Sequence, residues 1–227
     1  SGAQTITILG NGGIAATVSG QNTQSITVNA SSGSLAVGSS AANTFTLNTT
    51  GNITVDGSNS RLSGVQTMTI NTTTGTADLS GSKLGFQDAQ TVVLGGTGTG
   101  ATVLLNTLSG SASNMALSIS GLEGGVSAGN IHLNSGDLTI GAEAMTGELN
   151  VTSLKVSGAG SMIVSTGSAG QFSAGTTNAA GSFSLDASAN TSGSSSITLT
   201  TFSASGAVTI SAGSGSGDIT LADIEGE

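Results

Sequence analysis

The only histidine of this 227-residue sequence, His132, has no evident partner for chemistry. A histidine becomes a catalytic base beside a nucleophile, and a zinc ligand beside cysteines, carboxylates or further histidines. The sequence contains no cysteine and no second histidine, so neither a zinc site nor a nucleophile–histidine pair is indicated. In the stretch NIHLN, His132 stands between Ile131 and Leu133, and this alternation predicts an outward position on a strand.

Paired carboxylates are the second chemistry to consider. Asp56, Asp78 and Asp88 are spaced along the sequence so that two of them could stack in a repeating fold. Solenoid pectin lyases and glycosidases use convergent acids, but they also need basic or aromatic residues to hold a sugar. Aromatic residues make up only 2% of the sequence, and lysine and arginine together number three. We therefore expect that the protein is not an enzyme.

Calcium is the one cofactor that the acidic residues of this sequence could bind. The densest acidic stretches are DGSN at 56–59, QDAQ at 87–90 and LADIEGE at the carboxyl-terminal end. None matches the calcium loop of an EF-hand, and the nonapeptide G-G-x-G-x-D occurs nowhere. The sequence thus predicts no cofactor, and the candidate ligands for a calcium ion are Asp56, Asp88, Asp223 and Glu225.

The charge balance excludes two classes of partner. The formal net charge is −9, with Arg61, Lys83 and Lys155 as the only basic residues besides His132. Binding to nucleic acid requires a basic surface that neutralises several phosphates, and this chain has none. No apolar run approaches the eighteen or so residues of a membrane-spanning helix. We expect neither a nucleic-acid partner nor insertion into a membrane, and the sequence points to no particular carbohydrate or host ligand.

A repeated hexamer supplies the main structural signal. Each copy has Gln or Asn second and Ser or Thr third, and the copies follow one another at similar but unequal steps: AQTITI (3–8), TQSITV (23–28), ANTFTL (42–47), VQTMTI (65–70) and AQTVVL (89–94). Shorter apolar-x-apolar stretches lie between the hexamers. Near the carboxyl-terminal end, an apolar-Thr-apolar triplet recurs at a constant, shorter step. Alternation places Ile6 and Ile8 on one face and Thr5 and Thr7 on the other, which is typical of a half-buried strand.

Short strands at a regular step predict an all-β fold in which coils stack on one another. We expect a β-solenoid, or β-helix, of about ten two-strand coils of roughly 22 residues, forming one domain over residues 1–227. The least regular stretch, 106–130, is either an insertion or a boundary. A β-sandwich is the alternative, since it also uses regularly spaced short strands. The absence of Pro, Trp and Tyr favours the solenoid.

Stacked hexamers would also create an outward T-x-T face of hydroxyl and methyl groups. It comprises Thr5, Thr7, Thr27, Thr44, Thr46, Thr67 and Thr69. This array resembles the ice-binding faces of β-solenoid antifreeze proteins, which makes ice binding one functional hypothesis. Threonine ladders also stabilise any solenoid wall, and the unequal steps between hexamers argue against a strict match to an ice lattice.

Three longer stretches resemble bacterial surface proteins: LSGVQTMTINTTTGTADLSGSKLGFQDAQTVVLGG (62–96), IGAEAMTGELNVTS (140–153) and FSLDASANTSGSSSITLTT (183–201). They are similar to β-solenoid regions of surface-layer proteins and of adhesins of the repeats-in-toxin type. The stretch AVTISAGSGSGDITLA also resembles passengers of filamentous-haemagglutinin and autotransporter proteins. The resemblance implies an extracellular location on a bacterial cell surface. The missing G-G-x-G-x-D nonapeptides put calcium-triggered folding in doubt.

The ends of a solenoid offer strand edges on which another subunit can add. We therefore expect a structural protein that assembles with itself into a filament or surface layer. The predicted assembly ends are residues 1–8 and 218–227, with Thr5, Ile6, Thr7, Ile8, Asp218, Ile219, Thr220 and Leu221 as the principal residues. The alternatives are a rigid passenger or spacer segment of a large adhesin, and an ice-binding protein.

Overall fold

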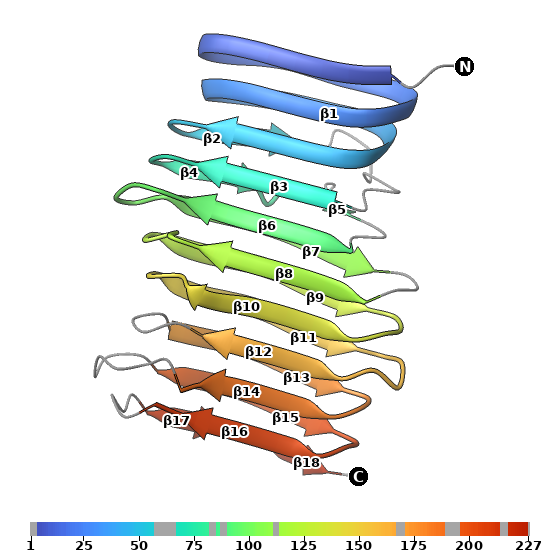
Figure 1. Ribbon diagram of the computed structural model, residues 1–227, viewed down its shortest axis with the longest axis vertical. Helices are drawn as coiled ribbons and strands as arrows, with labels where there is room; N and C mark the ends of the chain where they lie inside the picture. The colour runs from blue at the N-terminus through green and yellow to red at the C-terminus, as the bar shows by residue number, and fades with distance from the viewer. Residues whose placement is uncertain are drawn as a thin grey trace.

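The computed structural model describes residues 4–56, 67–81, 85–86, 90–110, 114–166, 171–188, 196–213 and 218–226. Every regular element in these residues is a β-strand, and the strands stack into a parallel β-solenoid (Figure 1). The all-β solenoid prediction is confirmed, and the parallel pairings rule out the alternative β-sandwich. Within the described residues, no helix is long and apolar enough to cross a membrane.

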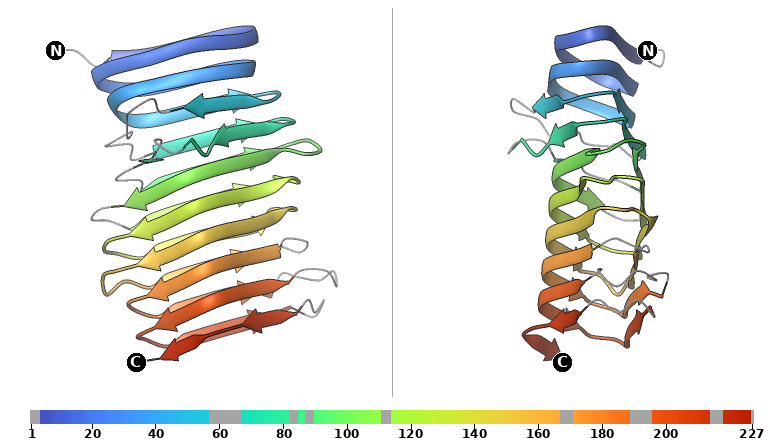
Figure 2. Two further views of the ribbon diagram at one scale, coloured as in Figure 1. Left: turned by 180° about the vertical axis from the view of Figure 1, so that it is seen from behind. Right: turned by 90° about the vertical axis from the view of Figure 1, so that its left-hand side faces the viewer.

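The strands form two walls, which are clearest when the molecule is seen from its side (Figure 2). The front wall contains the parts of β1 at residues 5–8, 25–29 and 44–49, then β3, β6, β8, β10, β12, β14 and β16. The back wall contains the other strands and further parts of β1. Their bounds are β1 (Gln4–Thr49), β2 (Ile53–Asp56), β3 (Thr67–Thr72), β4 (Thr76–Leu79), β5 (Gly85–Phe86), β6 (Thr91–Gly96), β7 (Thr102–Gly110), β8 (Met115–Ser120), β9 (Gly125–Leu133), β10 (Leu138–Ala144), β11 (Glu148–Val156), β12 (Met162–Thr166), β13 (Gln171–Ala179), β14 (Phe183–Ala187), β15 (Ile197–Ala204), β16 (Val208–Ala212), β17 (Ile219–Leu221) and β18 (Ile224–Gly226).

The front-wall pairings define seven turns, fewer than the ten coils expected. From the last part of β1 onward, one chain of register partners runs along this wall: Thr44, Thr67, Thr91, Ala116, Thr139, Ile163, Ser184 and Thr209. Most of these steps are longer than the coil length expected from the sequence, because the back strands carry an additional bend. At the amino-terminal side, the 46 residues of β1 themselves wind around the stack (Figure 1).

A bend in the long back-wall strands changes the alternation of inward and outward side chains part-way along each strand. In β11, Leu149 and Val151 point inward, and after an interval of three residues Leu154 and Val156 point inward again. Residue Thr152, at the phase change, is skipped by the pairings to both neighbouring strands. Residues 148–156, which contain two apolar-x-apolar patterns, are therefore one bent strand.

Residues 106–130 contribute to both walls. Their described part includes the end of β7, all of β8 and the first part of β9, and these strands pair in register with the coils on either side.

The interior is a narrow apolar core without tryptophan or tyrosine. Its largest buried side chains include Phe45, Phe172 and Phe183. The ring of Phe183 meets the edge of Phe202 with centroids 4.9 Å apart. Among the described residues four threonines are also buried, namely Thr49, Thr72, Thr166 and Thr177. Of these, Thr177 is fully buried and its hydroxyl has no hydrogen-bond partner. An unpaired buried hydroxyl lowers stability.

Turns and side-chain ladders keep the coils aligned. Gly121 has a φ of 69°, and a Cβ atom there would overlap the carbonyl oxygen of Gly96 in the neighbouring coil, so this turn requires glycine. Where the front strands begin, the Asp137 N–H donates to Asn114 Oδ1 over 2.9 Å, and the Ser161 N–H donates to Asp137 Oδ1 over 2.7 Å. These bonds satisfy backbone donors of one coil with side chains of the coil before it.

Candidate functional site

The predicted T-x-T face lies on the outer side of the front wall. Thr44 is in direct register with Thr67, and Thr46 with Thr69. At the amino-terminal side, Ser25 Oγ lies 3.4 Å from Thr5 Oγ1, so the same columns continue across β1. The face is half-exposed to exposed at all of its members: Thr5, Thr7, Thr27, Thr44, Thr46, Thr67 and Thr69. Beyond β3 one column continues to Thr91, whereas the other changes to Val93.

The columns stay straight although the hexamers are unequally spaced. The step from Thr44 to Thr67 is one residue shorter than the step from Thr67 to Thr91, yet both pairings are in register. The turns and the back half of each coil therefore absorb the difference in length. Strand pairing fixes the spacing between coils at about 4.8 Å whatever the loop length.

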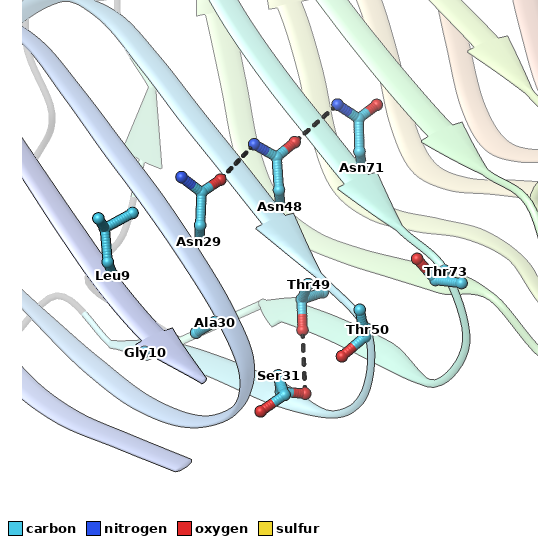
Figure 3. A pocket seen from close by; sticks show the side chains of 10 residues that line it. All are labelled: Leu9, Gly10, Asn29, Ala30, Ser31, Asn48, Thr49, Thr50, Asn71 and Thr73. Atoms are coloured by element: carbon cyan, nitrogen blue, oxygen red, sulfur yellow. Dashed lines mark hydrogen bonds between the residues drawn. The ribbon is translucent and has the colours of Figure 1, made fainter. Parts of the chain in front are cut away.

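A ladder of three asparagines runs beside the threonine columns. Asn71 Nδ2 donates to Asn48 Oδ1 over 2.8 Å, and Asn48 Nδ2 donates to Asn29 Oδ1 over 2.6 Å. Figure 3 shows the three amides aligned across neighbouring strands with the same polarity. This ladder was not predicted from the sequence, although a signal was present: each asparagine stands two positions after the second threonine of the T-x-T pattern.

The asparagine ladder borders a surface hollow with a volume of about 620 Å³. Its other lining includes Leu9 and Ala30 on β1 and the threonines at the following turns, Thr50 and Thr73 (Figure 3). No charged side chain lines it. Leu9 is 73% exposed, so its apolar side chain is available at the edge of the hollow. The hollow is therefore uncharged, with amide and hydroxyl groups set in a largely apolar surface.

The predicted assembly ends carry exposed apolar side chains. At the amino-terminal side, Thr5 and Thr7 are exposed and Ile6 and Ile8 are half-buried. At the carboxyl-terminal side, Asp218, Ile219 and Thr220 are exposed and Leu221 is half-buried. Ile219 is 38% exposed, Val208 47% and Ile224 63%.

The last strands also have free edges within the described residues. There, β16 is paired only with β14, and β17 and β18 are paired only with β15. Their other edges present backbone donors and acceptors on which a further strand could add.

His132 occupies the outward position expected of it, but it is not without a partner. Its Nε2 lies 2.8 Å from Ser157 Oγ, and it is in register with Lys155. Burial, and then the charge of Lys155, lower the pKa of His132 below its ordinary value. The expectation that no nucleophile lies beside His132 was wrong, because the coil brings together residues 25 apart. No carboxylate of the described residues hydrogen-bonds to this ring, so the pair lacks the third member of a catalytic triad.

The acids do not converge in the described residues. Asp78 lies in register with Thr54 rather than with Asp56, so the spacing of these two carboxylates along the chain does not stack them. Asp78 Oδ1 instead accepts hydrogen bonds from Ser80. Of the four calcium candidates, Asp223 is exposed with a φ of 46°. Asp88 and the side chains of Asp56 and Glu225 lie outside the described residues. The described residues contain no group of three or more His, Cys, Asp or Glu placed to hold a metal.

The match to a known protein family spans almost all of this solenoid. The family described as Toastrack DUF4097 matches residues 5–222. The chain belongs to this family. No curated protein and no solved structure matches it. The Toastrack match accounts for the solenoid and its repeats, whereas the likeness to surface-layer proteins, adhesins of the repeats-in-toxin type and haemagglutinins rests on the sequence stretches alone.

Proposed function

We propose that this Toastrack solenoid is a structural protein that associates with copies of itself, end to end, on the exterior of a bacterial cell. The observation that carries the proposal is that apolar side chains are left uncovered at both ends. Ile6 and Ile8 are only half-buried at one end, and Val208, Ile219 and Ile224 are exposed at the other. Removing apolar surface of this kind from water favours association by about 25 cal/mol per Å² buried.

A second copy of the chain suits these surfaces better than an unrelated partner does. The coils share one parallel register, so the free edge of β16 has the shape and polarity to receive a further front-wall strand. The first front-wall segment, at Thr5 to Ile8, has the same alternation of threonine and isoleucine as the strands already stacked. Such addition of a strand combines main-chain hydrogen bonds with pockets for alternate side chains.

The test is assembly of the purified protein as a function of concentration, followed by negative-stain electron microscopy and light scattering. We expect rods of several subunits or ordered sheets at high concentration. The double variant Ile219→Lys, Ile224→Lys should remain monomeric, because it places two charges in the contact. Ile163→Lys is the matched control: Ile163 is 40% exposed, but it lies on the outer face of β12, so this variant should assemble normally.

The outcomes separate the proposal from its main alternative. Short monomeric rods at every concentration would overturn self-assembly and favour a rigid spacer segment of a large adhesin. Equal loss of assembly in the control would place the contact on the wall instead of the ends. Repeating the experiment with calcium and with a chelator tests the remaining cofactor hypothesis, because disassembly in chelator would assign a role to the acids.

Ice binding is the second candidate, and the straight register of the T-x-T face favours it. The unequal hexamer steps argue against a lattice match only if they displace the threonines, and Thr44, Thr46, Thr67 and Thr69 are not displaced. Thermal hysteresis of the purified protein is the test. Thr46→Tyr should abolish it and Thr152→Tyr, on the back wall, should not; no hysteresis in the parent protein excludes this function.

A further inference from the structure

The hollow beside the asparagine ladder has features of a binding site that are independent of the solenoid ends. It lies on the outer side of the front wall, next to the turns that carry Thr50 and Thr73 (Figure 3). None of the side chains that line it is charged. A charged ligand would find no opposite charge there, so the hollow favours an uncharged one.

The ladder leaves both donors and acceptors available to such a ligand. A primary amide has two N–H donors and an oxygen with two lone pairs. Asn48 uses one donor and accepts one bond within the ladder, and no described residue accepts a bond from Asn29 Nδ2. Because the three amides point the same way, each bond polarises the next and strengthens the free donor at Asn29.

Each end of the ladder is bounded by a residue that cannot continue it. Leu9 lines the hollow on the amino-terminal side of Asn29 and has no polar side-chain atom. At the other end, Asn71 is in register with Gly95, where an added Cβ would lie 2.8 Å from Asn71 Oδ1. Among the described residues, one end of the ladder is therefore the unpaired Nδ2 donor of Asn29, beside the apolar side chain of Leu9. The other end is the Oδ1 acceptor of Asn71, beside Gly95.

We propose that this hollow binds a neutral oligosaccharide that lies along the asparagine ladder. Hydroxyl groups both donate and accept, so they can bond to the Asn29 N–H and to the carbonyl oxygens of the same ladder. The C–H surface of a sugar ring would pack against the exposed side chain of Leu9. A ligand built of repeated, similar units suits a ladder whose amides recur at the coil spacing of about 4.8 Å.

The test uses cellohexaose as the neutral probe and hexagalacturonate as its charged counterpart. Each is titrated into the ¹⁵N-labelled protein while the side-chain amide signals of Asn29, Asn48 and Asn71 are followed by NMR. Cellohexaose should shift these signals saturably, and hexagalacturonate should shift them much less. Asn48→Ala should weaken binding about tenfold, equivalent to one or two lost hydrogen bonds.

Two further variants keep the test decisive if Asn48→Ala also loosens the coils. Leu9→Ala removes only an exposed apolar contact and should weaken binding about threefold, consistent with the loss of part of a buried side-chain contact. Asn178→Ala is the matched control, since Asn178 bonds to Ser203 on the back wall. Absence of a shift at millimolar cellohexaose, or equal weakening by Asn178→Ala, would overturn the proposal. Neither outcome bears on assembly at the solenoid ends.

Discussion

The first and the last described coils are held in register by different parts of the chain. In the first coils, the alignment is reinforced outside the core, by the amide ladder of Asn29, Asn48 and Asn71. In the last coils, an outward bond from Asn178 to Ser203 is accompanied by aromatic packing inside, where Phe183 meets Phe202 and Phe172 is also buried. The difference shows that a thin solenoid can obtain the same register from outward hydrogen bonds or from inward aromatic packing. Only the first solution also builds a distinctive surface.

The largest effect should come from breaking the aromatic packing. Phe183→Ala removes a fully buried ring together with its contact to Phe202. We expect the free energy of unfolding to fall by about 3–5 kcal/mol, measured by urea denaturation. Ser184→Ala, on the outward side of the same strand, is the control and should change it little. A loss for Phe183→Ala below about 1 kcal/mol would contradict aromatic stabilisation of these coils.

A smaller change in stability, of opposite sign, is expected at the unpaired buried hydroxyl in the same region. Thr177 is buried without a partner for its hydroxyl. Thr177→Val keeps the shape and removes the polar atom, so the protein should become more stable by about 1–2 kcal/mol. Thr176→Val, at the exposed neighbouring position, should give no such gain. Destabilisation by Thr177→Val would show that the hydroxyl has a bonding partner in solution.

Breaking the outward ladder should cost less than breaking the aromatic packing. Asn48→Ala removes two side-chain hydrogen bonds, but water can replace them on this partly exposed face. We expect a loss of about 1 kcal/mol in the free energy of unfolding. Asn150→Ala removes an exposed outward asparagine from β11 and is the matched control. Equal losses for the two variants would argue that the ladder adds nothing beyond ordinary surface asparagines.

The smallest effect concerns His132, which lies in the coils between these two regions. Burial and Lys155 lower its pKa, so the folded state favours the neutral ring. In the unfolded chain the pKa of His132 is about 6.5. The stability that the neutral ring contributes is therefore present above pH 6.5, and it is lost as the pH falls from 6.5 through the lower pKa of the folded state. Proton NMR should give a titration midpoint below 6.5, and Lys155→Gln should raise it part of the way. A midpoint at or above 6.5 would contradict this description.

The fold was accessible from the sequence because the inward residues alternate so regularly. Ile6 and Ile8, like Phe45 and Leu47, indicate their strands by period two, and the outward threonines follow from the same pattern. The number of turns was not accessible, since the bend at Thr152 and its equivalents joins two apparent strands into one. Such a bend depends on packing between coils, which no local pattern encodes.

The candidate sites were only partly accessible. The T-x-T columns could be inferred, but their straightness could not, because the loop lengths suggest displacement and only strand pairing removes it. The contact of His132 with Ser157 joins residues one coil apart, and its discovery requires the coil length. The asparagine ladder was visible in the sequence as an Asn directly after three of the five hexamers. Its hydrogen bonds and the hollow beside it follow from the register.

The parallel pairing of successive coils also fixes how this molecule would respond to force. Hydrogen bonds between coils run along the long axis of the solenoid, so tension on the two ends loads them in series, one coil after another. Each coil that peels away would release a length of chain that spans about 80 Å when fully extended. A tethered solenoid of this kind would therefore lengthen under load in a series of similar steps, one for each coil released.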